Sequence, residues 1–171
     1  NEFGRRLGYL TNVVCCYQDM SPRDLFMRRS TDEQGNTRWE RSSLVESALE
    51  GRLCVLDGIH RLTDDTLASL ASLASDREVQ LFDGTRLVSS ERHETMVHEM
   101  VRKTTAAAVG EIGEMTEVSI EACRNELLAL GVFPVHPSFR LLCLAEPPGK
   151  EKDRWLSSEV FPLFSFELLP K

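Results

Sequence analysis

The stretch Leu53-Cys54-Val55-Leu56-Asp57-Gly58-Ile59-His60-Arg61 decides the fold of this chain. Four apolar residues lead directly into an aspartate and a glycine. A short apolar run without alternation is typical of a strand buried on both faces, as in a parallel sheet. An acid at the carboxyl end of such a strand faces the crevice in which open α/β sheets bind ligands. Two interpretations stay open here: an aspartate that faces a ligand, or a core strand that ends in a turn-forming Asp-Gly pair.

Length and charge limit the classes of protein to consider. A chain of 171 residues suits one domain, and its 42% of hydrophobic residues can build a substantial core. The 20 lysines and arginines against 27 acids give a net charge of −7, which argues against a mainly electrostatic nucleic-acid binder. No apolar run approaches the length of a membrane span. We therefore expect no nucleic-acid partner and no membrane span.

The cysteines and histidines do not form a metal-binding pattern. The five cysteines are an odd count without a C-x-x-C pair, so a zinc site is not predicted. Cys15, Cys16, Cys54 and Cys143 lie in apolar runs, which predicts buried thiols in a reducing, intracellular compartment. His93 and His98 are five residues apart, a spacing that does not place them on one helix face.

Periodicity and capping residues predict an alternation of helices and strands. Ser21 and Pro22 predict a helix start, Gly51 a helix end, and Thr63 the cap of a further helix. Asp83-Gly84 predicts a two-residue hairpin turn. The expected elements are a helix over 2–10, a strand over 12–17, a helix over 44–50, a hairpin over 78–89, mostly helix over 90–130 with a break at 110–113, a loop over 132–138, a strand over 139–145, a helix over 156–163 and a strand over 165–169.

A polar segment over residues 28–41 interrupts the helix that begins after Ser21. Its Gln34-Gly35-Asn36 centre predicts a β-hairpin or an ordered loop. Two interpretations of its arginines remain open: a solvated face, or an insert that faces a partner or a pore. Those arginines are Arg28, Arg29, Arg38 and Arg41, with Arg23 nearby.

Three blocks in this order resemble the AAA+ ATPase core of the dynein-related, midasin and MoxR branch. They are residues 44–57, which resemble that branch's helix and Walker B strand, residues 139–147, which resemble its sensor 1 strand, and residues 155–164, which resemble its arginine-finger segment. Residues 17–25, 56–61, 76–78, 82–87 and 136–140 are similar to an AAA+ module of proteins that also contain a von Willebrand factor A domain. The resemblance implies an α/β fold: a partial three-layer αβα P-loop NTPase core with a parallel sheet, β-hairpin inserts and a helical insert.

The resemblance also implies a domain organisation. Residues 1–171 would be a partial AAA+ core that starts after Walker A, with Walker B at about 53–58, the helical insert at about 90–130, the sensor 1 strand at 139–146 and no lid domain. No G-x-x-x-x-G-K-S/T occurs in the sequence, and its Gly149-Lys150 pair is followed by Glu151. Most of a phosphate cradle is therefore missing from these residues. We expect the chain to be a piece of a longer protein.

By resemblance, Asp57 is the Walker B aspartate, which binds nucleotide through Mg²⁺ that it holds by way of water. Gly58 stands where the catalytic glutamate usually stands, and glycine cannot act as a general base. Glu146 falls at the sensor 1 position, and a carboxylate there repels phosphate unless it is protonated or turned away. Leu163 occupies the arginine-finger position, where leucine cannot stabilise transition-state charge. No catalytic residue is therefore assigned, and ATP and Mg²⁺ are the implied cofactors.

The resemblance implies an ATP-binding and ATP-hydrolysing AAA+ module of a larger protein, in which this segment supplies the Walker B and sensor 1 regions. The alternative is a degenerate, non-hydrolysing module with a structural or interaction role in a ring. A third interpretation is a stand-alone α/β interaction domain. Implied partners are nucleotide and other AAA+ modules or subunits, and the implied location is the mitochondrion. This segment alone is expected to be inactive.

Overall fold

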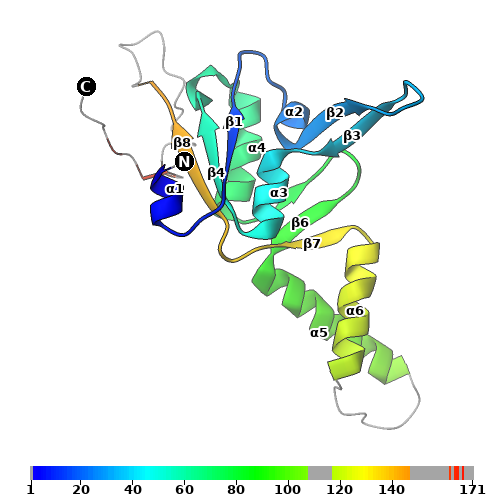
Figure 1. The fold of residues 1–171 in the computed structure, drawn as a ribbon. Helices are drawn as coiled ribbons and strands as arrows, with labels where there is room; N and C mark the ends of the chain where they lie inside the picture. The colour runs from blue at the N-terminus through cyan, green and yellow to red at the C-terminus, as the bar shows by residue number, and fades with distance from the viewer. Residues whose placement is uncertain (1, 108–116, 147–161, 163, 166, 168–171) are drawn as a thin grey trace.

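The structure is a computed structural model that describes residues 2–107, 117–146, 162, 164, 165 and 167. The chain has a mixed α/β fold organised on a three-stranded parallel sheet in the order β1-β4-β8 (Figure 1). The predicted α/β class with a parallel sheet is confirmed. The elements in chain order are α1 (Glu2–Arg6), β1 (Thr11–Cys15), α2 (Pro22–Phe26), β2 (Met27–Thr31), β3 (Thr37–Arg41), α3 (Ser43–Glu50), β4 (Leu53–Asp57), the 3-10 turn η1 (Ile59–Arg61), α4 (Asp64–Ser75), β5 (Val79–Gln80), β6 (Arg86–Ser89), α5 (Ser90–Ala107), α6 (Glu117–Ala129), β7 (Val132–Val135) and β8 (Arg140–Leu144).

The strand predicted from the opening stretch is the central strand of the main sheet. β4 pairs in parallel with β1 on one side and with β8 on the other. Leu56 lies opposite Val14 and Cys143 in this register, and neither Leu56 nor Cys54 is exposed to solvent. The apolar run therefore forms the middle of the core, because hydrogen-bonded neighbours satisfy its backbone on both sides.

One face of the main sheet packs on helices. Leu44 of α3 and Leu67 of α4 belong to the same buried cluster as Leu56. The other face is more open, because Val13 of β1 is 52% exposed and Leu144 of β8 is 40% exposed. The strands expected over 12–17 and 139–145 as buried strands are therefore covered on one face and partly exposed on the other. A run of apolar residues does not tell which face of a strand is covered.

Local capping follows the sequence at two of the three predicted positions. The Ser21 side chain accepts from the Asp24 amide and the Asp24 carboxylate accepts from the Ser21 amide, which forms a capping box. Gly51 ends α3 with φ 72°, a left-handed conformation suited to glycine. Thr63 stands at the N-cap of α4, but its hydroxyl lies 3.0 Å from that of Thr66 instead of capping an amide.

The interrupting segment is a hairpin of β2 and β3, one of the two forms predicted for residues 28–41. Arg28 pairs with Glu40 across it at 2.9 Å. The guanidinium of Arg23, in α2, lies 5.2 Å from the ring centroid of Trp39 and 4.7 Å from that of Phe82. This stacking ties the hairpin to the turn between β5 and β6. The partner- or pore-facing role of its arginines stays a prediction.

A second sheet has the order β5-β6-β7. It differs from the sequence-based expectations at residues 132–138 and in the length of the hairpin turn. Residues predicted as a loop over 132–138 instead form β7, which pairs in parallel with β6. Pro134 is tolerated because β7 is an edge strand in the described sheet, where a missing N–H costs little. The β5–β6 hairpin is confirmed, but its turn is longer than two residues, because the Leu81 amide donates to the Thr85 carbonyl at 2.7 Å.

The helices α5 and α6 form a hairpin that projects away from the main sheet (Figure 1). Val97 and Val101 of α5 pack with Cys123 and Leu127 of α6 in a second buried cluster. Met96 and Met100 are half-buried and pack against this cluster. The predicted helical insert is thus two helices, and the predicted break at 110–113 lies outside the described residues.

The carboxyl-terminal expectations fall mainly on residues that the structure leaves undescribed. The helix predicted over 156–163 and the strand predicted over 165–169 lie there, apart from Pro162, Ser165 and Glu167. Among the described helices, none is long and apolar enough to cross a membrane.

Candidate functional site

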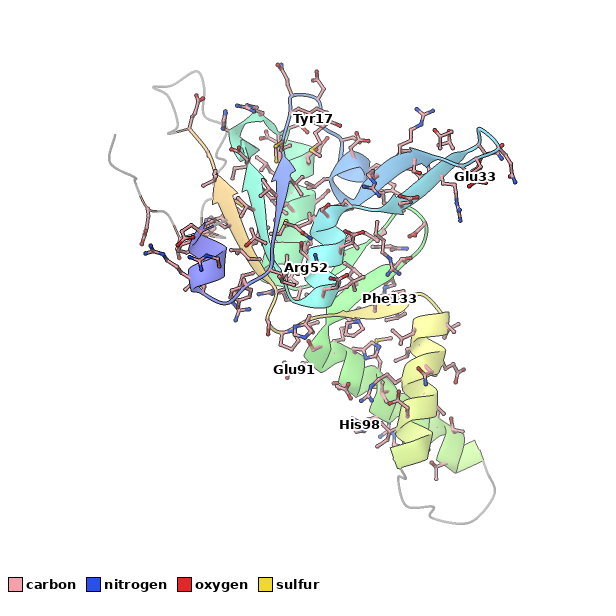
Figure 2. The ribbon with its side chains drawn as sticks, viewed as in Figure 1. Tyr17, Glu33, Arg52, Glu91, His98 and Phe133 are labelled. Atoms are coloured by element: carbon pink, nitrogen blue, oxygen red, sulfur yellow. The ribbon has the colours of Figure 1, made fainter. Side chains whose placement is uncertain are left out.

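The candidate site lies at the carboxyl ends of the three parallel strands. The register places Cys15 of β1, Asp57 of β4 and Leu144 of β8 in one row at this edge. In Figure 2, Tyr17 lies in the loop beyond the end of β1, at the same edge of the sheet. The carboxyl edge of a parallel sheet is where α/β proteins bind ligands.

Asp57 is the last residue of β4, and its side chain is exposed. Its backbone carbonyl accepts from the Cys16 amide at 2.8 Å, which joins the ends of β4 and β1. Within the described part of the chain, no group of three or more Asp, Glu, His or Cys side chains could hold a metal ion. A single carboxylate still suits Mg²⁺, which keeps several waters and takes its other ligands from phosphates.

Gly58 and η1 turn the chain sharply after Asp57. Gly58 has φ 88° and ψ 38°, a left-handed conformation that glycine adopts without strain. Its amide donates to the Leu144 carbonyl at 2.9 Å, so the turn is fixed to β8. Ile59, the first residue of η1, and Leu62, which follows it, are buried in the core and anchor the turn. The conformation of the turn is therefore set by packing as well as by hydrogen bonds.

Arg61 folds back over this glycine. A β-carbon built on Gly58 would lie 3.1 Å from Nη1 and 3.2 Å from Cζ of Arg61. Nη1 also reaches the Cys16 carbonyl at 3.4 Å, although the side chain as a whole is exposed. A guanidinium thus occupies the space into which a glutamate at position 58 would project.

His60 connects η1 to the residues after β8. Its Nδ1 accepts from the Glu146 amide at 3.2 Å, and its Nε2 lies 3.8 Å from Glu146 Oε1. An accepting Nδ1 carries no proton, so the neutral ring holds its proton on Nε2, facing the carboxylate. The Glu146 side chain is 79% exposed and is turned toward His60.

The cysteines near this edge differ in environment. Cys16 is buried, and burial first, with the negative charge of Asp57 next, raises its pKa to about 11. Cys15 is exposed, which corrects the expectation that it is buried. Successive strand residues face opposite sides of the sheet, so one of an adjacent pair at the strand end turns away from the core. Every one of the five cysteines is a free thiol.

The structure describes three of the four residues that were predicted at the site. Asp57, Gly58 and Glu146 lie at one edge of the sheet, on two neighbouring strands and the turns that follow them. Leu163 lies outside the described residues. Sequence reasoning missed Arg61, because a contact between residues 58 and 61 depends on the left-handed turn. The signal for that turn, an Asp-Gly pair at a strand end, was present.

Comparison with known proteins identifies the family of this chain. A model of the AAA domain of the dynein-related subfamily matches residues 1–164. The von Willebrand factor A domain-containing protein 8 of Mus musculus is 38% identical over 167 residues, which is 96% of this chain. The chain spans 8% of the length of that relative. With a match over nearly its whole length and a main sheet of the expected parallel form, this chain belongs to the dynein-related subfamily of AAA domains.

Proposed function

We propose that this chain is part of an AAA+ nucleotide-binding module and supplies its Walker B and sensor 1 regions. One observation carries the proposal: Asp57 stands exposed at the carboxyl end of the central strand, in register with Cys15 and Leu144. Asp57 would hold Mg²⁺ by way of water, and the metal would neutralise part of the phosphate charge of ATP. The Walker B region would cover residues 53–58 and the sensor 1 region residues 139–146, with residues 90–130 as an insert.

The surroundings of Asp57 favour nucleotide binding over hydrolysis by residues of this chain. Gly58 offers no general base, and the guanidinium of Arg61 fills the space beside it. Glu146, at the sensor 1 position, is turned toward His60. Since a base must reach the attacking water, we expect this module to retain ATP and to take part in a ring through its hairpins and its helical insert.

His60 follows Asp57 closely in the sequence and could replace the missing base, but its contacts argue against that role. Its Nδ1 already accepts a hydrogen bond from the Glu146 amide, and its ring is largely buried. The neutral ring therefore has no lone pair directed at a substrate water.

The test is steady-state ATP turnover of the full-length natural protein. We expect His60→Ala to leave turnover within about twofold of wild type, because a positioned base contributes at least about a hundredfold. Gly58→Glu should not raise turnover either. A loss of turnover by about a hundredfold in His60→Ala would contradict a non-hydrolysing module. His98→Ala, an exposed histidine on α5, is the matched control.

The remaining elements of the proposal concern the protein as a whole. Assembly into a ring with other AAA+ modules is typical of the family. A mitochondrial location is proposed on the resemblance alone. Both would be examined in the full-length protein, by mass photometry and by imaging of the endogenous protein.

A further inference from the structure

Arg61 ends the turn that follows Asp57, and its guanidinium lies next to Gly58 and the Cys16 carbonyl. The guanidinium lies against Gly58 and reaches the carbonyl of Cys16, so it spans the ends of β4 and β1. The buried Ile59 and Leu62 hold the turn that carries it. The guanidinium therefore lies at the carboxyl end of the main sheet, beside the turn that follows Asp57.

No ion pair with another described residue neutralises the charge of Arg61. Within the described residues, no carboxylate lies within 4.0 Å of its guanidinium. An arginine has five N–H donors, and one of its nitrogens contacts the Cys16 carbonyl. Most of its donors therefore remain able to bind an anion, and guanidinium groups match phosphate oxygens in geometry.

The position after the Walker B aspartate carries a glutamate in the proteins that this chain resembles, and here it carries the uncharged Gly58 with the guanidinium of Arg61 beside it. A β-carbon on residue 58 would lie 3.1 Å from Nη1 of the guanidinium. The absence of a carboxylate at position 58, together with a guanidinium beside it, changes the local potential in favour of a phosphate group. The guanidinium would then neutralise part of the phosphate charge, and Mg²⁺ would not have to neutralise all of it.

We propose that Arg61 binds the terminal phosphate of ATP at this site and so makes the module select ATP over ADP. The inference rests on the proposed function, because it needs nucleotide to bind beside Asp57. Arg61 then helps to keep ATP bound, and it belongs to the same module as Asp57. It stabilises bound ATP in the place where a catalytic glutamate would promote its hydrolysis.

The experiment measures dissociation constants of the fluorescent nucleotides mant-ATP and mant-ADP for the full-length natural protein in Mg²⁺. The binding component that Asp57→Ala removes defines this site. Arg61→Gln should weaken mant-ATP at this site by about tenfold and mant-ADP by less than about twofold, since it removes charge-assisted hydrogen bonds to one phosphate. Arg61→Lys, which keeps the charge, should lose less. Arg102→Gln, the same change on the exposed surface of α5, should leave both constants unchanged.

The outcomes separate this inference from the proposal on which it rests. If Asp57→Ala removes a binding component but Arg61→Gln leaves it unchanged, or weakens both nucleotides equally, the role of Arg61 is overturned and the nucleotide site stands. If Asp57→Ala removes no component, both the nucleotide site and the role of Arg61 are overturned. Selective weakening of mant-ATP by Arg61→Gln, with partial rescue by Arg61→Lys, supports the inference.

Discussion

The guanidinium of Arg61 and the α-carbon of Gly58 lie so close that a β-carbon on residue 58 would stand 3.1 Å from Nη1 of Arg61. Gly58 also has a φ of 88°, which side chains of the L form rarely adopt. Two independent constraints, backbone conformation and a neighbouring side chain, therefore oppose any larger residue here. A glutamate introduced at this position would have to displace Arg61 and reshape the turn.

We predict that Gly58→Ala weakens the local stability of β4 by about 1–2 kcal/mol from backbone strain, with a further penalty from contact with Arg61. Native-state hydrogen exchange of the β4 amides measures this local free energy. Gly35→Ala is the matched control, because Gly35 has φ +84° but no atom within 4 Å of its β-carbon position. In an Arg61→Ala background the contact penalty at Gly58 should disappear. Strictly additive effects of Gly58→Ala and Arg61→Ala would contradict the contact.

Thiol labelling should distinguish the two adjacent cysteines at the end of β1. With a pKa of about 11, Cys16 is roughly 0.03% thiolate at pH 7.5, and it is also buried. We predict that iodoacetamide modifies the exposed Cys15 well before Cys16 or Cys54, whose pKa burial raises to about 12. Because Cys15 lies beside Asp57 in register, Mg²⁺–ATP should slow its modification in the full-length protein. Peptide mass spectrometry measures both rates, and equal rates for Cys15 and Cys16 would contradict the burial pattern.

The helical hairpin should lose stability in acid because of His93. This side chain is 1% exposed, and burial lowers its pKa, although the nearby Glu94 carboxylate acts in the opposite direction. The unfolded state therefore takes up a proton more readily than the folded state. Stability is complete above the ordinary histidine pKa of about 6.5 and falls as the pH drops below it toward the lowered folded value.

This prediction is checked by hydrogen exchange of α5 and α6 between pH 5 and pH 8, corrected for intrinsic exchange rates. Protection in the wild type should decrease below about pH 6.5. His93→Leu should remove most of that dependence, whereas His98→Gln, an exposed position on the same helix, should retain it. An equal pH dependence in wild type and His93→Leu would show that another group is responsible.

Much of the fold can be predicted from local sequence signals. The capping box at Ser21, the left-handed glycine at Gly51 and the apolar run before Asp57 are determined by nearby residues, and the structure has the expected element at each. Local signals fail where pairing is non-local. Pro134 suggests a loop, but the strand that contains it pairs with β6 at the edge of the sheet. Cys15 lies in an apolar run, but it is exposed to solvent.

The candidate site is predictable only in part for the same reason. The residues before Asp57 and the following glycine place an acid at the edge of the sheet. The guanidinium over Gly58 and the His60–Glu146 contact depend on the turn and on the approach of β8, which no local pattern specifies.

The most direct test of this account is titration of ATP into the full-length natural protein with Mg²⁺ and with EDTA. Asp57→Ala is compared with Asp76→Ala, an exposed aspartate at the far end of α4. We predict that Asp57→Ala weakens Mg²⁺-dependent binding at this site by at least about tenfold and that Asp76→Ala does not, because only the first removes the carboxylate that holds Mg²⁺ by way of water. Unchanged Mg²⁺-dependent binding in Asp57→Ala would contradict the assignment of Asp57 and, with it, the nucleotide site at the end of β4.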